Sequence, residues 1–421
     1  MTPKIITTMR TYSWSAFFTD FMAGITVGLV ALPLSLAIAI ASGATPAQGL
    51  ITAIVGGFFV SALGGSRVQI GGPTGAFIVV VYEVIANHGV EGLVLATLMA
   101  GFILVIAGVL RAGSLVAYVP EPVINGFTLG IAVIIATSQL RDLLGLQTAD
   151  LPAEFFAKLE ALWAARASFD WHALVVGLIT GVLIFTLRRK LPPKVPGLII
   201  AVGIGSALAL LPGMTVDTIG SRFGELPNQL PMPALPEISL AKLQELLPSA
   251  FIIAFLAGVE SLLSAVVADR MVDGSHRPRA ELRAQGVANI ASSLMGGMPV
   301  TGAIARTATN VNAGGRTPMA GIVHAATILL VMLIAAPLAS QLAMPAMAAL
   351  LILTAWNMSE PDKWHSYWYG PKQDRFLIFL TMALTVMVDL TVAIGVGVAL
   401  GFALRRRERD RPPQEWHPRE K

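Results

Sequence analysis

The sequence predicts an all-α polytopic membrane protein, and three observations carry this prediction. The 421 residues are 55% hydrophobic and only 13% charged, whereas soluble domains carry about 25% charged residues. Apolar segments recur along the whole chain, and a helix that crosses a bilayer needs about 20 mostly apolar residues. A motif rich in glycine and proline occurs once in each half of the chain. A soluble globular core is therefore excluded.

Fourteen transmembrane segments are predicted, in two halves of seven. They lie near residues 18–41, 47–63, 74–86, 92–110, 120–140, 171–187, 195–211, 246–268, 281–295, 302–312, 317–335, 338–355, 375–388 and 390–404. Because seven is odd, the halves have opposite orientation, which makes a 7+7 inverted repeat of the kind found in many transporters. The third and tenth segments are short, and we expect half-helices there, each preceded by a short extended stretch.

The positive charges predict the orientation. Of the 29 Lys and Arg, the predicted outer connections hold Arg141, Lys158, Arg166, Arg222 and Lys242, Arg306 lies within a segment, and the others face the opposite side. Cytoplasmic connections carry the excess of Lys and Arg in membrane proteins. Both termini are therefore predicted to be cytoplasmic.

The repeated motif reads Gly-Gly-Pro-Thr-Gly-Ala-Phe at 71–77 and Gly-Gly-Met-Pro-Val-Thr-Gly-Ala at 296–303. Neither copy can continue a helix, because proline lacks the N–H and glycine is costly within helices. Non-helical backbone at membrane depth is tolerated only where protein or a water-filled cavity surrounds it. A helix that begins there presents free N–H groups and the positive end of its dipole. Two such starts facing each other predict an anion site near the midplane; two ordinary loops are the alternative.

The predicted anion-binding residues open these two half-helices: Thr74, Gly75, Ala76, Phe77, Thr301, Gly302, Ala303, Ile304 and Arg306. Both motif copies are expected to open a short apolar helix. Arg306 follows the second copy by about one helical turn. It either adds a full positive charge at the anion site or forms a salt bridge with Glu260 without touching the substrate, and the sequence leaves both open.

Glu260 and Ser264 lie one turn apart within the eighth segment. A charged carboxyl at membrane depth is costly and is typical of a functional site. One hypothesis is that Glu260 couples transport to a proton. A second is a sodium site of Glu260, Ser264 and backbone carbonyls, since carboxylate and carbonyl oxygens suit a hard cation. The alternative to both is a structural partner for Arg306.

Other classes of function find no support in the residues. The chain has no cysteine, which excludes thiolate metal sites. No metal site is expected among the six His, and no nucleophile or cofactor motif is visible. We therefore expect no enzyme, no cofactor beyond a coupling H⁺ or Na⁺, and no nucleic-acid partner. The aromatic cluster of Trp364, Tyr367, Trp368 and Tyr369 is predicted to lie at the membrane interface.

Three stretches carry a resemblance to a known family. They read Asp-Phe-Met-Ala-Gly-Ile-Thr-Val-Gly-Leu at 20–29 with Ala-Leu-Pro at 31–33 and Ala-Ile-Ala at 37–39, Ser-Arg-Val-Gln-Ile-Gly-Gly-Pro-Thr-Gly-Ala-Phe at 66–77, and Ala-Arg-Thr at 305–307 followed by Gly-Gly-Arg-Thr at 314–317. They resemble the first, third and tenth segments of the sulfate permease (SulP) family of anion transporters. The match extends over essentially the whole chain.

The resemblance implies a fold shared with uracil permease, in which a core domain moves against a gate domain. The core would comprise about 18–111 and 246–335, and the gate about 114–211 and 338–404. The anion would lie between the N-termini of segments three and ten. Family members form dimers, and a homodimer is the expectation here. The transport domain is predicted over 1–404, followed by a basic cytoplasmic tail at 405–421 without the family's C-terminal STAS domain.

One departure from the family bears on the substrate. Many sulfate carriers have glutamine and an aromatic residue where this chain has Leu34 and Ile38. These residues and Ser35 are predicted to line the pocket, and their more apolar wall suits bicarbonate or a small carboxylate.

The predicted function is proton-coupled symport of a small carboxylate, of a dicarboxylate such as fumarate or succinate, or of bicarbonate. It would take place in the bacterial inner membrane by elevator-type alternating access. The alternatives are a sodium-coupled bicarbonate or sulfate transporter, a passive anion channel or exchanger, and a uracil-type nucleobase carrier.

Overall fold

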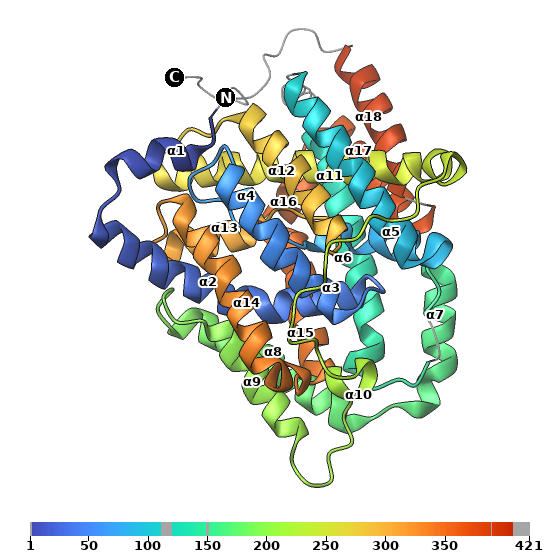
Figure 1. Ribbon diagram of the computed structural model, residues 1–421. Helices are drawn as coiled ribbons and strands as arrows, with labels where there is room; N and C mark the ends of the chain where they lie inside the picture. Colours follow the sequence, from blue (N-terminus) through green and yellow to red (C-terminus); the bar gives the residue numbers. More distant parts are fainter. Residues whose placement is uncertain (1, 111–119, 149–150, 389, 407–421) are drawn as a thin grey trace.

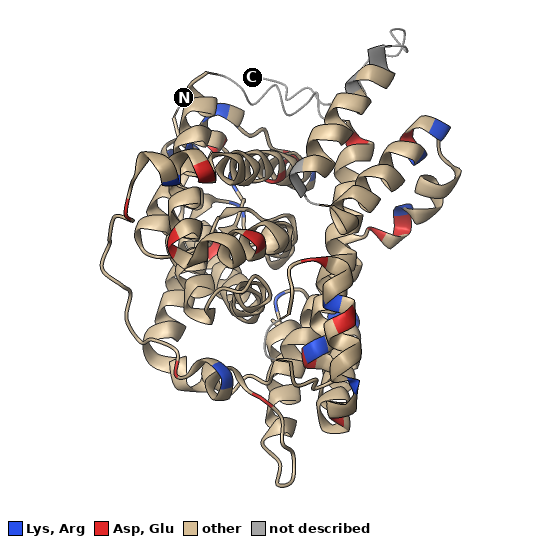
Figure 2. Cartoon of the chain, turned by 90° about the vertical axis from the view of Figure 1, so that its right-hand side faces the viewer, with Lys and Arg blue, Asp and Glu red and all other residues tan. Residues whose placement is uncertain are grey.

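The computed structural model describes residues 2–110, 120–148, 151–388 and 390–406, and most of these residues are helical. Within these residues, seven helical stretches are long and apolar enough to cross a membrane: Trp14–Ala41, Pro46–Leu63, Gly75–Val109, Glu121–Leu143, Trp171–Lys190, Leu240–Val272 and Pro318–Ser340. Shorter helices occupy the remaining predicted segments. Figure 2 shows that most of the ribbon carries no charged residue.

The helices fall close to the predicted segments. The first half contains α1 (Lys4–Thr8), α2 (Trp14–Ala41), α3 (Pro46–Ile51), the π-helix η2 (Thr52–Gly56), α4 (Gly57–Leu63), η3 (Gly75–Phe77), α5 (Ile78–Val109), α6 (Glu121–Leu143), α7 (Phe155–Ala164), α8 (Trp171–Lys190) and α9 (Gly197–Ala209). The second half contains α10 (Ile219–Phe223), α11 (Leu240–Val272), α12 (Pro278–Leu294), α13 (Ile304–Ala313), α14 (Pro318–Ser340), α15 (Met344–Met358), α16 (Trp364–Tyr369), α17 (Lys372–Met387) and α18 (Leu390–Arg406).

The predicted third and fourth segments form one element, α5, which is broken at Gly89. That residue has φ 69°, ψ −177°, a conformation that glycine adopts without steric cost. The break therefore separates a short first part of α5 from a longer second part. The predicted tail at 405–421 lies mainly outside the described residues, as does most of the predicted boundary between segments four and five.

The helices pack in two groups, which we call the first and second helix groups. In the first group, α5 packs on α11 and α12, and α14 packs on α2 and α4. In the second group, α6 packs on α15 and α17, and α8 packs on α9 and α15. Contacts between the groups are fewer and run mainly through α2, α15, α9, α6 and η3. In Figure 1, α1 and the end of α18 lie at one end of the molecule and α10 at the other.

The two halves meet in a two-stranded antiparallel sheet of β1 (Gly71–Gly72) and β2 (Thr301–Gly302). Gly71 pairs with Gly302, and Gly72 pairs with Thr301. A Cβ added at Gly72 would lie 1.7 Å from the Arg306 Nη1, and one added at Gly302 would lie 1.5 Å from the Gln69 Nε2. Glycine is therefore required on both strands, and the repeated motifs hold each other in place.

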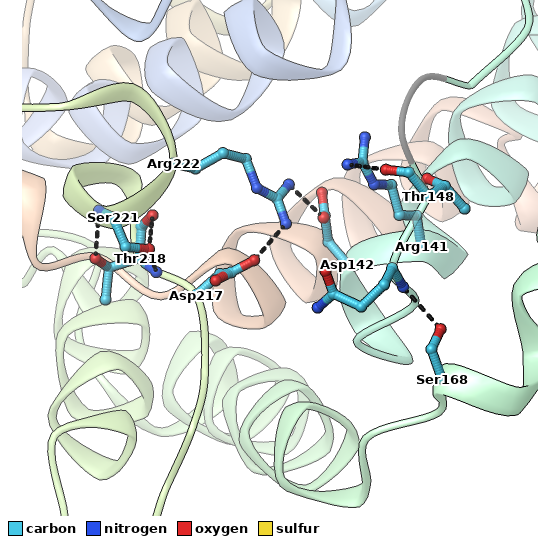
Figure 3. A network of polar contacts seen from close by, with 9 residues as sticks. Arg141, Asp142, Thr148, Ser168, Asp217, Thr218, Ser221 and Arg222 are labelled. Carbon is cyan, nitrogen blue, oxygen red and sulfur yellow. Dashed lines mark hydrogen bonds and ion pairs between the residues drawn. The ribbon is translucent and has the colours of Figure 1, made fainter.

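A cluster of ion pairs links α10 to the end of α6 and to the connection before α10. Arg222 Nη1 donates to Asp142 at the end of α6 over 2.6 Å, and Nη2 donates to Asp217 over 3.0 Å. Figure 3 shows the guanidinium between the two carboxylates. The same connection bonds to the start of α15, because the Met344 N–H donates to the Asp217 carbonyl over 2.8 Å. These contacts join the end of α6, the helix α10 and the start of α15.

Candidate anion site

The two half-helices begin on either side of the β1–β2 pair. Thr74 is the N-cap of η3, which leads directly into α5, and Ala303 is the N-cap of α13. Both caps have extended backbone, and neither supplies a side-chain cap to its own helix. The first-turn N–H groups of a helix have no intrahelical acceptor. Both starts are therefore electropositive and suited to an anion.

The second motif copy is offset from its predicted position. We expected Thr301 and Gly302 to open a helix as Thr74 and Gly75 do, but they form β2, and α13 begins at Ile304. The expectation of an apolar helix is also wrong for this copy. Thr307 and Asn310 of α13 are buried and polar, as is Arg306. The second copy has one extra residue on each side of its proline. Its Thr-Gly pair lies in the strand, and the helix begins two residues later than in the prediction.

Arg306 lies at the centre of the site and is only 2% exposed. Its Nη2 donates to the Pro73 carbonyl over 2.9 Å and to the Ser35 Oγ over 3.2 Å. Nε and Nη1 are buried and have no hydrogen-bond partner in the part of the chain that the structure describes, which is costly for a charged group. Among the described residues, no ion pair within 4.0 Å joins it to Glu260, so the salt bridge, one of the two alternatives that the sequence left open, is not formed. The two unpartnered donors are suited to hold an anion.

Glu260 bonds to the opposite half-helix. Thr74 Oγ1 donates to Glu260 Oε2 over 2.8 Å, which places the carboxyl of α11 at the N-cap of η3. Ser264, one turn further on, does not join this contact. Its Oγ donates to Thr307 Oγ1 over 3.4 Å. The residue pair expected for a sodium site is therefore directed to different partners.

The remaining predicted residues are distributed around these starts. Gly75 and Phe77 are buried and Ala76 is half-buried, whereas Ile304 of the second start is 39% exposed. Thr301 Oγ1 donates to the Ala257 carbonyl over 2.9 Å. Ser35, predicted as pocket lining, contacts Arg306 directly.

Of the other two residues predicted to line the pocket, Ile38 is buried and Leu34 is half-buried. Both belong to the hydrophobic packing around α2. That these two residues line the pocket beside Ser35 therefore stays a prediction.

Sequence reasoning missed the polar residues that support the site. Gln69 Nε2 donates to Ser261 Oγ over 2.8 Å, and the Ile70 N–H donates to Thr307 Oγ1 over 3.1 Å. Glu281 is fully buried, and its Oε2 accepts the Gly65 N–H over 2.8 Å. A carboxyl, an amide and two hydroxyls inside membrane segments were the signal that could have found them.

The fold and the site define a multi-pass membrane anion transporter. The profile of the Sulfate permease family matches residues 17–381. The "Putative sulfate transporter YvdB" of Bacillus subtilis is 43% identical over 381 residues, covering 90% of this chain and 72% of that protein. The "Bicarbonate transporter BicA" of a Picosynechococcus strain is 31% identical over 387 residues, covering 88% and 67%.

Solved structures agree with this class. The transmembrane domain of a cyanobacterial bicarbonate transporter BicA has a TM-score of 0.82 at 28% identity, covering 91% of this chain and 98% of that one. SLC26A9 matches with a TM-score of 0.86 at 16% identity, covering 96% and 68%, and this likeness shows the fold alone. The chain belongs to the sulfate permease family. The resemblance and the all-α polytopic fold predicted from the sequence are confirmed.

Proposed function

We propose that this protein is a secondary active symporter that carries a small carboxylate, a dicarboxylate or bicarbonate together with a proton. The observation that carries the proposal is the Thr74–Glu260 hydrogen bond of 2.8 Å. It links a carboxyl within the membrane to the residue that caps the first half-helix. Loss or gain of a proton on Glu260 acts directly on the element that would bind the anion.

The anion would lie between the start of η3 and the start of α13, next to the unpartnered Nε and Nη1 of Arg306. The apolar wall of Leu34 and Ile38 supports bicarbonate or a small carboxylate over sulfate, because it offers no additional donors. The names of two relatives, a putative sulfate transporter and a bicarbonate transporter, support a small oxyanion.

Movement would be of the elevator type, with the first helix group as core and the second as gate. The sparse contacts between the groups support this division. The protein would lie in the bacterial inner membrane with both termini cytoplasmic, and it would form a homodimer.

The test is uptake of labelled fumarate, bicarbonate and sulfate into proteoliposomes, each with an imposed proton gradient, with a sodium gradient, and with neither. Wild-type protein is expected to concentrate one of these anions only when the proton gradient is present. Glu260→Gln is expected to abolish concentrative uptake. Glu160→Gln, an exposed acid on α7, is the matched control and should behave like wild type.

Each alternative has its own outcome in this experiment. Uptake that follows sodium would favour a sodium-coupled bicarbonate or sulfate transporter. Anion conductance or exchange without accumulation would favour a passive channel or exchanger. Concentrative uptake that survives Glu260→Gln would contradict proton coupling through Glu260.

A further inference from the structure

The start of the first half-helix is covered by side chains of the second helix group. A Cβ added at Gly75 would lie 2.7 Å from the Met358 Sδ and 3.5 Å from the Ile135 Cδ1. Met358 is the last residue of α15, and Ile135 lies within α6. Gly75 and Ile135 are buried, and Met358 is half-buried. Glycine at 75 is thus what allows the two helix groups to approach at this point.

Among the described residues, the first turn of the second half-helix is more open than that of the first. Ile304 is 39% exposed and Ala305 is also exposed. The two starts would contribute N–H groups to one anion, yet the first two residues of the second are exposed where those of the first are buried or half-buried. The covering groups are a thioether and an aliphatic side chain, which offer no hydrogen bond to replace an anion's lost water.

The chain beyond Met358 holds it in position. The Ser359 N–H donates to the Ala355 carbonyl over 3.0 Å, and the Ser359 carbonyl accepts Trp364 Nε1 over 2.8 Å. Tyr367 OH donates to Glu360 Oε2 over 2.8 Å. Burial and the Glu360 carboxylate raise the pKa of Tyr367 above its ordinary value. Part of the aromatic cluster predicted for the membrane interface therefore braces the end of α15.

We propose that Met358, together with Ile135, forms a lid over the first half-helix start and determines which anions reach the N–H groups of Gly75 and Ala76. This inference rests on the anion site proposed above. A larger anion meets the Met358 side chain before it meets the backbone. The apolar lid also selects against anions that hold their water strongly, because the lid gives no polar contact in exchange.

Steric complementation tests the lid. Gly75→Ala places a methyl group against Met358 and is expected to reduce uptake about tenfold, within the range for a change of one methyl group in a binding pocket. The double change Gly75→Ala, Met358→Ala is expected to recover most of this loss. Met358→Ala alone is expected to raise uptake of sulfate relative to bicarbonate by a similar factor. Met347→Ala is the control, since Met347 is a buried methionine of the same helix.

A second measurement does not depend on transport. The chain contains no cysteine, so Ala76→Cys provides a single thiol beside the covered start. Its reaction rate with a small methanethiosulfonate reagent is expected to rise about tenfold when Met358 is also changed to alanine, and to stay unchanged with Met347→Ala.

The outcomes separate the lid from the proposed function. An equal thiol rate with and without Met358 would overturn the lid, as would unchanged selectivity of Met358→Ala in an active transporter. If wild-type protein takes up no anion, the proposed function fails, and the thiol rates still decide whether Met358 covers the site.

Discussion

The two copies of the glycine-proline motif differ in their charged partners and in their exposure. The first copy has no charge of its own and receives Glu260 at its N-cap Thr74, under the cover of Met358. The second copy carries Arg306 within its own helix and is open at Ile304. The sheet between them joins a glycine pair to a threonine-glycine pair. An inverted repeat therefore supplies two similar helix starts with different neighbours, and both charged residues, Glu260 on α11 and Arg306 on α13, come from the second half of the chain.

The difference between the two motif copies can be tested most directly by substituting the glycines of the β1–β2 sheet. Gly72→Ala would place a Cβ 1.7 Å from the Arg306 Nη1, which forces the guanidinium away from Pro73 and Ser35. We expect roughly a tenfold or larger loss of anion uptake, because charged hydrogen bonds are worth about 1.5–3 kcal/mol. The measurement is uptake in proteoliposomes at matched protein levels.

Gly302→Ala is the companion variant on the other strand. Its Cβ would meet the Gln69 Nε2, so it disturbs the support from Ser261 without moving a charge. We expect a lower melting temperature and a smaller loss of anion affinity. Gly181→Ala on α8, with nothing within 4 Å of the new Cβ, controls for the substitution itself. Equal losses of affinity in both strand variants would contradict the division of roles.

The sequence predicts the fold well because membrane helices are determined by local composition. The segments and the start of the first half-helix follow from apolar runs interrupted by glycine and proline. The register of the second copy did not follow. Thr301-Gly302 resembles Thr74-Gly75 in sequence, but pairing with Gly71 and Gly72 makes it a strand, and such pairing is a contact between distant residues.

The partners of the charged residues were equally inaccessible from the sequence. Arg306 and Glu260 suggested a salt bridge, yet each bonds to the first motif copy, through Pro73 and Thr74 respectively. Met358 carried no signal at all, because a methionine at the end of an apolar helix is usually a packing residue.

The two threonines of the motif copies offer a smaller test of the same comparison. Thr74→Val removes the hydroxyl that donates to Glu260, whereas Thr301→Val removes one that donates to the Ala257 carbonyl. We expect Thr74→Val to shift the pH profile of uptake and Thr301→Val to leave it in place. A profile that moves equally in both variants would mean that the Thr74–Glu260 contact has no special part in coupling.

Substitution of Arg222 tests whether effects on transport at the two half-helix starts are separate from effects on the overall stability of the protein. Arg222→Ala breaks the contacts with Asp142 and Asp217 that Figure 3 shows. The Arg222 side chain is 22% exposed. We expect a loss of about 1–3 kcal/mol in stability, visible as a lower melting temperature in detergent. Anion selectivity should be unchanged. Arg166→Ala, at an exposed arginine, should melt like wild type. A change in selectivity with Arg222→Ala would link the Arg222 ion pairs to the anion site.

The smallest effect is expected at Lys158, which ties α7 to the helix that follows the first start. Its Nζ lies 5.4 Å from the centroid of the Tyr82 ring on α5, and burial lowers the pKa of Lys158 below its ordinary value of 10.5. The charged form is therefore penalised in the folded protein, and this penalty disappears as pH rises toward 10.5. Lys158→Met should raise the melting temperature at neutral pH, with a gain over wild type that shrinks at alkaline pH. A gain at Lys158 that is constant with pH would place its cause in packing instead of charge.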